Sequence, residues 1–203
     1  SKEGQAYLND MKTAANFAFA NRAVLTDRLF KGLRAELGER IELSTLYDVS
    51  HNIAKIEDHI VHGKNCTCVV HRKGATRAFS GEQSELHSKF SKTGQPVIVP
   101  GDMGRGSWIM AGPQSGQNQA FGSACHGAGR ALSRAAARKQ IDAEVKENEL
   151  RNKGIIVQAA TKNILSEEAP EAYKDVDGVI ENTTKAELAR AVLRLEPLAV
   201  IKG

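Results

Sequence analysis

The N-terminal segment of the chain carries apolar residues at helical spacing. Those that recur at intervals of three or four residues are Leu8, Met11, Ala15 and Ala18. Others widen the same apolar surface: Phe17, Phe19, Val24, Leu25 and Leu29. This periodicity is typical of an amphipathic α-helix. It predicts one or two helices between residues 4 and 35 that end near Leu37 and Gly38.

The rest of the chain mixes shorter elements. Apolar runs rich in β-branched residues predict strands at 43–49, 67–71, 96–99, 108–111, 155–159 and 192–201. Helical patterns, the first with Gly154 as its cap, cover 130–152, 167–176 and 185–189. His59 and His62 lie in a sequence typical of a solvated hairpin. Because strands and helices do not alternate and no repeat is present, we expect an α+β fold, a single irregular, loop-rich domain over residues 1–203 with no internal boundary.

The composition permits a polyanionic partner without requiring one. Lys and Arg number 28 against 24 Asp and Glu, a net charge of +4. Aromatic residues make up only 5% of the chain, which disfavours a sheet that stacks RNA bases on rows of exposed rings. Any contact with nucleic acid is therefore expected to run mainly through phosphates.

The three cysteines are an odd number in a sequence without a secretory signal, which favours free thiols and a cytoplasmic protein. Cys66 and Cys68 could form half of a metal clip, although their alternation with Val70 fits the inward face of a strand equally well. No apolar run approaches the about 20 residues that span a bilayer, so no membrane association is expected.

The segment Gly122-Ser-Ala-Cys-His-Gly-Ala-Gly-Arg130 has the layout of a phosphate site. His126 precedes glycines whose amides can approach an anion, and a helix starting near Gly129 or Arg130 would point its positive end at the same place. Arg134 and Arg138 follow Arg130 at intervals of four, on one helical face. The alternative is an ordinary capping loop before a solvated basic helix.

Other segments carry candidate chemistry. His51 and Asn52 follow a predicted strand, where His51 could ligate a metal or could be a hydrogen-bonded histidine of a turn. Lys73 lies in a basic, glycine-containing loop, and 100–107 is a glycine-rich turn with a lone arginine and a hydroxyl. Each loop is a phosphate loop or a plain surface loop.

Several strings together resemble the RtcB family of RNA ligases, in the family's order from Gln5 to Gly203. The strings are Tyr-Asp-Val-Ser-His-Asn-Ile-Ala-Lys, Val-His-Arg-Lys-Gly-Ala-Thr-Arg-Ala-Phe, Gly-Gln-Pro-Val-Ile-Val-Pro-Gly-Asp-Met-Gly, Ser-Ala-Cys-His-Gly-Ala-Gly-Arg-Ala-Leu-Ser-Arg, Glu-Glu-Ala-Pro-Glu-Ala-Tyr-Lys and the terminal Ile-Lys-Gly. The resemblance implies a GTP- and Mn²⁺-dependent ligase, acting in RNA repair or tRNA splicing. Such an enzyme joins RNA 2′,3′-cyclic phosphate or 3′-phosphate ends to 5′-hydroxyl ends through a histidine-GMP intermediate.

Matching the family's motifs residue by residue implies a role for each position. His126 matches the guanylylated nucleophile, and His51 matches a manganese ligand. The matched nucleotide contacts are Asn52, Pro100, Gly101, Asp102, Met103, Ser107, Gly127, Ala128, Gly129, Tyr173 and Lys202. Lys73, Arg130 and Arg134 are expected on RNA or triphosphate oxygens.

One departure from the family concerns length. Family members are roughly twice as long as these 203 residues, and their first half supplies an Asp-x-x-Cys element, two further metal-binding histidines and an Asn-His loop. We therefore expect this chain to be the C-terminal portion of the catalytic domain, inactive alone, with the missing N-terminal half as its partner and apolar surface exposed where that half would pack. Two alternatives stay open: a non-catalytic RNA- or nucleotide-binding module, and a metal-dependent phosphoesterase that uses His51.

Overall fold

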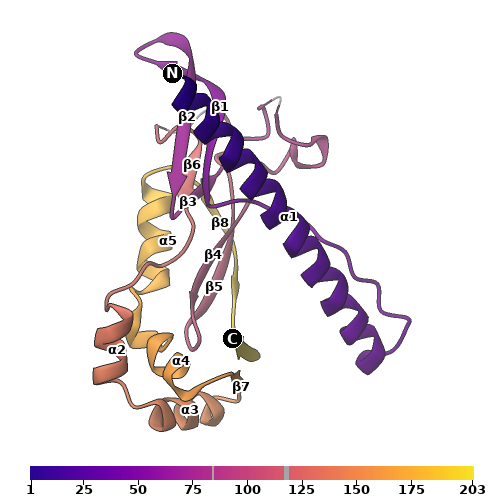
Figure 1. Ribbon diagram of the computed structural model, residues 1–203, viewed down its shortest axis with the longest axis vertical. Coiled ribbons are helices and arrows are strands. Elements are labelled where there is room, and N and C mark those ends of the chain that lie inside the picture. The colour runs from indigo at the N-terminus through magenta and orange to yellow at the C-terminus, as the bar shows by residue number, and fades with distance from the viewer. Residues whose placement is uncertain (84, 117–118) are drawn as a thin grey trace. The chain divides into compact units, whose positions relative to one another are not determined.

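The structure is a computed structural model that describes residues 1–83, 85–116 and 119–203 (Figure 1). Its contacts divide the chain into two compact units, Ser1–Lys73 and Gly74–Gly203. Helices and strands are mixed and the strands form small separate sheets, which confirms the α+β class. The absence of an internal domain boundary stays a prediction.

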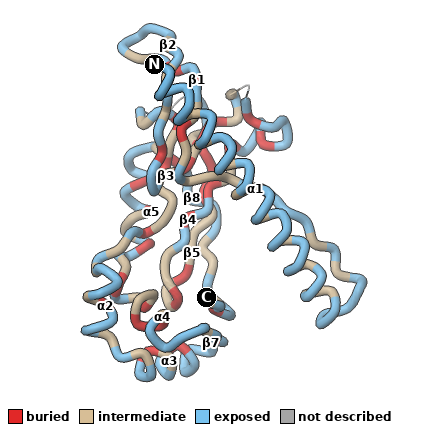
Figure 2. Tube along the Cα trace, viewed as in Figure 1, coloured by how far each residue is buried: buried red, intermediate tan, exposed pale blue. Residues whose placement is uncertain are grey.

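The first unit begins with the long helix α1 (Lys2–Leu37), as predicted. The Ser1 hydroxyl caps its start, and Gly38, with a φ of 101°, ends it. Leu8, Met11, Ala15 and Ala18 form a half-buried stripe, which confirms the predicted apolar face. A second set of apolar side chains on α1 is exposed: Phe17, Val24, Leu25 and Leu29. Figure 2 shows that no residue of α1 is buried.

A hairpin of β1 (Asn52–Val61) and β2 (Lys64–Lys73) completes this unit. Its strands are antiparallel, and Cys66 and Cys68 lie on the more buried face of β2, as the strand interpretation predicted. The predicted strand at 43–49 is wrong, because this segment has no regular structure. It is held to α1 by side chains instead: Asp48 accepts a hydrogen bond from Arg22 Nε at 2.7 Å.

The expectation of a solvated hairpin is wrong at one of its two histidines. His62 is exposed in the turn, but His59 is buried with its Nε2 3.0 Å from Glu57 Oε2. Arg72 donates to both oxygens of the same Glu57 carboxylate at 2.8 Å. A buried carboxylate needs such paired donors to offset the loss of water, so these side chains from β1 and β2 form one buried ionic cluster.

The second unit is built on an antiparallel sheet in the order β4-β5-β8. Its strands are β4 (Pro96–Asp102), β5 (Gly106–Ala111) and β8 (Arg190–Leu195). Helix α5 (Val176–Lys185) contacts each of these strands, as Figure 1 shows. The core between them includes Val97, Val99, Met110, Val176 and Ile180. The strand pair β3 (Ala75–Arg77) and β6 (Ser123–Cys125) leads into the segment that contains His126.

A second core lies around the parallel pair β7 (Ile156–Ala159) and β9 (Ala199–Lys202). Helices α3 (Ala143–Asn152) and α4 (Lys162–Glu167) pack beside β7. Its buried side chains are Met103, Leu150, Ile155, Val157, Leu165 and Val200. Met103 therefore joins the β4–β5 turn to this core.

The predicted helix at 130–152 is wrong at its start and broken in its middle. Helix α2 (Arg134–Gln140) begins only after Ser133, whose hydroxyl accepts from the Ala136 amide, and α3 follows separately. The amides of Ala131 and Leu132 donate instead to the Ala172 carbonyl, so tertiary pairing overrides helical propensity.

Other predicted boundaries also differ. Segment 167–176 is mostly irregular around the single turn η2 (Pro170–Ala172), and α5 ends at Lys185 where a helix was expected to begin. The closing strand is interrupted between β8 and β9, where Pro197 has no amide to donate. A further single turn, η1 (Ser88–Phe90), lies before β4. Among the described residues no helix has the length and apolarity needed to cross a membrane.

The core of the second unit gives a stability prediction. Replacing the fully buried Met110 with alanine should lower the free energy of unfolding by about 2–5 kcal/mol, since the mutation leaves a cavity. Val192→Ala on the adjacent strand, whose side chain is 61% exposed, is the matched control and should cost less than about 0.5 kcal/mol. Denaturant unfolding measures both, and equal losses would contradict the placement of this core.

Candidate nucleotide site

The β4–β5 turn is shaped by close backbone approaches. The register of β4 and β5 shifts between Pro100 and Asp102, which marks a bulge at Gly101. A Cβ at Gly101 would lie 2.1 Å from the Gly106 carbonyl oxygen, so no larger residue fits there. The Ser107 hydroxyl accepts from the Gly101 amide at 3.4 Å across the turn. Glycine therefore allows Pro100, Gly101 and Ser107 to line one side of a cavity.

Asp102 holds this turn from inside. Its carboxylate accepts from the amides of Gly104 and Arg105 at 2.9 Å and from Arg105 Nε at 2.5 Å. The Asp102 side chain is 0% exposed, and Met103 is buried in the adjacent core. These two side chains thus shape the turn, and both residues line the cavity beside it.

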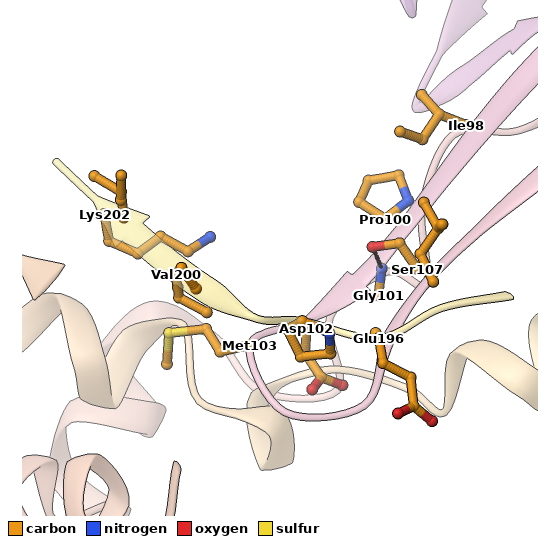
Figure 3. Close-up of a pocket in the computed structure, with 14 residues that line it drawn as sticks. Ile98, Pro100, Gly101, Asp102, Met103, Ser107, Glu196, Val200 and Lys202 are labelled. Atoms are coloured by element: carbon orange, nitrogen blue, oxygen red, sulfur yellow. Dashed lines mark hydrogen bonds between the residues drawn. The ribbon is translucent and has the colours of Figure 1, made fainter. Parts of the chain in front are cut away.

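The cavity has a volume of about 370 Å³ and lies between the β4–β5 turn and the chain's C-terminal strand (Figure 3). Pro100, Gly101 and Ser107 line it from the turn, and Val200 and Lys202 line it from β9. A cavity of this size is typical of small-molecule sites. The structure therefore brings together six of the predicted nucleotide contacts, namely Pro100, Gly101, Asp102, Met103, Ser107 and Lys202.

The loop after β6 brings His126 to this turn. The Ala128 amide donates to the Pro100 carbonyl at 3.0 Å, and the His126 amide donates to the Gly74 carbonyl at 3.3 Å. A Cβ at Gly127 would approach the Pro100 oxygen to 3.3 Å, which explains a glycine beside the contact. His126 is half-buried. Because α2 begins at Arg134, the expected helix N-terminus at Gly129 is wrong, and loop amides stand there instead.

A third segment, around Tyr173, joins the same loop. Arg130 and Tyr173 form an isolated antiparallel bridge, and the Lys174 amide donates to the Gly129 carbonyl at 2.9 Å. The Arg130 guanidinium lies 4.8 Å from the centre of the Tyr173 ring, and its Nη1 donates to the Tyr173 hydroxyl at 2.9 Å. Arg130 thus covers one face of the ring of Tyr173, one of the predicted nucleotide contacts.

Glu168 connects these side chains. It accepts a 2.5 Å hydrogen bond from the Tyr173 hydroxyl and lies 3.3 Å from Arg130 Nη1 and 3.5 Å from Lys202 Nζ. The preceding Glu167 pairs with Arg134 at 3.5 Å and with Arg138 at 3.3 Å. No role was predicted for these carboxylates, although they open the matched string Glu-Glu-Ala-Pro-Glu-Ala-Tyr-Lys. The cluster of predicted phosphate-binding cations was the available signal, because cations held close together need acidic partners to reduce their mutual repulsion.

These contacts change the acidities of both partners. Burial would raise the pKa of Glu168, but the Tyr173 hydrogen bond and the charges of Lys202 and Arg130 lower it below its usual value. Burial, together with the hydrogen bond to Glu168 and its negative charge, raises the pKa of Tyr173 to about 12. Tyr173 is therefore a neutral hydrogen-bond donor and Glu168 an ionised acceptor at neutral pH.

The remaining predicted site residues lie in the first unit. Asn52 and Lys73 are direct partners at the open end of the β1–β2 hairpin, and His51 immediately precedes Asn52. The hairpin register thus brings together residues that are far apart in sequence. Within residues 1–83, 85–116 and 119–203, no three His, Cys, Asp or Glu side chains converge as a metal site.

Comparison with known proteins identifies the family. The sequence pattern of the family described as tRNA-splicing ligase RtcB matches residues 1–203, so the chain belongs to the RtcB family. The protein of that name from Thermococcus kodakarensis is 46% identical over 206 residues, and that from Methanococcus maripaludis is 44% identical over 206 residues. Each match covers 100% of this chain and 43% of the relative, so the chain spans less than half the length of these relatives.

The acidity of Tyr173 can be measured directly. In an ultraviolet titration of the folded protein, one of the three tyrosines should ionise only near pH 12, and Tyr173→Phe should remove that step. Because the pKa is raised in the folded state, the associated stability is present below pH about 10 and is lost as the pH rises toward 12. Tyr7→Phe is the control. A late step that survives Tyr173→Phe would contradict the contact with Glu168.

Proposed function

We propose that this chain is the nucleotide-binding portion of a GTP- and Mn²⁺-dependent RNA ligase. The enzyme joins RNA ends that carry a 2′,3′-cyclic phosphate or 3′-phosphate to ends that carry a 5′-hydroxyl, in RNA repair or tRNA splicing. Membership of the RtcB family supports the class of reaction. The observation that carries the proposal is that hydrogen bonds hold three segments together beside one cavity. These segments are the β4–β5 turn, the His126 loop and the Tyr173 segment.

In the first step, His126 is the nucleophile. An imidazole nitrogen attacks the α-phosphorus of GTP, and a P–N bond forms as the bond to the pyrophosphate oxygen breaks. The products are histidine-GMP and pyrophosphate, with the imidazole proton lost to solvent. The GMP then passes to the RNA 3′-phosphate, and the 5′-hydroxyl displaces it to form the new phosphodiester. Backbone amides of Gly127 and Gly129 are suited to stabilise the charge that develops on phosphate oxygens, while the Ala128 amide holds the loop to the Pro100 carbonyl.

GMP would bind in and beside the cavity between the β4–β5 turn and β9. Lys202 lines this cavity and would donate to the nucleotide, and the face of Tyr173 opposite Arg130 would stack on guanine. Arg130 and Arg134 would contact RNA or triphosphate oxygens, and both are already paired with Glu168 and Glu167. Phosphates must therefore compete with these carboxylates for the arginines, so the site should bind unrelated anions with only modest affinity.

The relatives are longer than this chain, and in the complete enzyme the residues described above would act together with that additional part. His51 would supply one manganese ligand, Asn52 would contact the nucleotide, and Lys73 would contact RNA. Manganese would supply Lewis-acid neutralisation of the phosphates. The second, exposed set of apolar side chains on α1 includes Phe17 at 77% exposure and Leu29 at 58%. This set is suited to pack against that additional part. The 203 residues alone are then inactive, and the reducing cytoplasm is the expected location.

The test is transfer of labelled GMP from GTP to the complete enzyme in the presence of manganese. We expect an acid-labile adduct that is lost, by at least about a thousandfold, in His126→Ala, because the variant has no nucleophile. His62→Ala, in the exposed hairpin turn, is the matched control and should label as the unmodified protein does.

Each alternative has its own outcome in this assay. Binding of GTP without a covalent adduct would favour a non-catalytic nucleotide-binding module. Release of phosphate from RNA ends without an adduct would favour a metal-dependent phosphoesterase. An adduct of unchanged amount in His126→Ala would refute the assignment of the nucleophile.

A further inference from the structure

Arg105, in the middle of the β4–β5 turn, bridges segments that are far apart in sequence. Its Nε donates to the Asp102 carboxylate, and its Nη2 donates to the backbone carbonyls of Pro170 and of Tyr173, the latter at 3.0 Å. The planar guanidinium presents several donors in one rigid fork, which suits simultaneous bonds to a carboxylate and to carbonyls. One side chain therefore fixes the turn to the segment that carries Tyr173.

This bridge closes a ring of contacts. The turn is bonded to the His126 loop through Ala128 and Pro100, and that loop is bonded to the Tyr173 segment through Lys174 and Gly129. Those two connections are backbone hydrogen bonds, which most substitutions preserve. The third connection, from the Tyr173 segment back to the turn, depends on the side chain of Arg105.

Further contacts hold Arg105 in place. Its own carbonyl accepts from Arg194 Nη2 at 2.8 Å, and Arg194 Nε lies 3.2 Å from Asp177 Oδ1. The indole of Trp108 donates to the same Asp177 oxygen at 2.6 Å. Since the Asp102 side chain is 0% exposed, its charge depends on Arg105 as the neutralising partner.

We propose that Arg105 is a positioning residue for the nucleotide site, and this inference rests on the proposed function. Arg105 is not among the residues that line the cavity, so it acts through the segments that it joins. It keeps Tyr173 at a fixed distance from the amides of the β4–β5 turn, so that one nucleotide can contact both. Without this bridge the Tyr173 segment keeps its bonds to the His126 loop but loses this direct tie to the turn, so it can shift relative to the turn. The shift weakens recognition of guanine and leaves His126 and its loop in place.

The chain offers a matched control. Arg190 also donates to two backbone carbonyls, those of Gly112 at 3.2 Å and Thr93 at 2.7 Å. It pairs with Ala111 at the end of the β5–β8 ladder opposite the Ser107–Leu195 pair. Arg190→Ala therefore removes the same kind of bridge at a distance from the cavity.

The experiment measures guanylylation of the complete enzyme as a function of GTP concentration for Arg105→Ala, Arg105→Lys and Arg190→Ala. We expect the half-saturating GTP concentration to rise about tenfold or more in Arg105→Ala, with the rate at saturating GTP changed less than about threefold. Preference for GTP over ATP should fall with it. Arg105→Lys keeps the charge beside Asp102 but loses the fork, so it should fold even if the alanine variant does not and show an intermediate shift.

Hydrogen exchange at the amides of Ala172, Tyr173 and Lys174 provides a readout independent of the reaction. It should be faster in Arg105→Ala and unchanged in Arg190→Ala. A half-saturating concentration equal to that of the unmodified protein, or a loss of rate with unchanged half-saturation, would overturn the positioning role. An unmodified enzyme that takes no label at all would instead refute the proposed function, and the exchange data would still decide whether Arg105 holds the Tyr173 segment.

Discussion

The hydrogen bond from the Ala128 amide to the Pro100 carbonyl is the contact on which the candidate site depends. It joins the loop that carries His126 to the bulged turn of the central sheet. The contact is possible because Gly127 lies beside the Pro100 oxygen and because Gly101 brings the turn within reach of Gly106. Both partners are backbone atoms, so the position of His126 is set by main-chain geometry and by the core beneath it, in which Ala128 is buried.

Electrostatic balance is the second constraint on this site. The cations expected to bind phosphate do not stand in an open basic patch, because Glu167 and Glu168 pair with Arg130, Arg134 and Lys202. The carboxylates hold the long side chains in defined positions, which lowers the entropy lost when a ligand binds. The same pairing reduces the net positive charge. We therefore expect selectivity for a ligand that also fills the cavity, over simple polyanions.

The sequence predicted one or two helices between residues 4 and 35, the strands of the β4-β5-β8 sheet and the α+β class, since each depends on local periodicity. It also assigned the candidate site to three loops, and that assignment stays a prediction. It did not predict that helix α2 starts at Arg134, because the pairing of Ala131 and Leu132 with Ala172 is a contact across some 40 residues. It also did not predict the hydrogen bonds of the Asp102 carboxylate to the amides of Gly104 and Arg105 and to the Arg105 side chain, and a contact of Asp102 with the nucleotide stays a prediction.

The most direct test of the account is to locate the nucleotide. A photoreactive azido analogue of GTP, bound to the complete enzyme and then irradiated, should label the peptide of residues 199–202, which line the cavity of about 370 Å³. It should also label the peptide that contains Tyr173, which is connected to Lys202 through Glu168. A second cavity of about 250 Å³ lies among residues of α3, β7 and α4, including Arg151 and Lys162. Labelling there, with the peptides around Tyr173 and Lys202 unlabelled, would contradict the central claim that the turn, the His126 loop and the Tyr173 segment together form the nucleotide site.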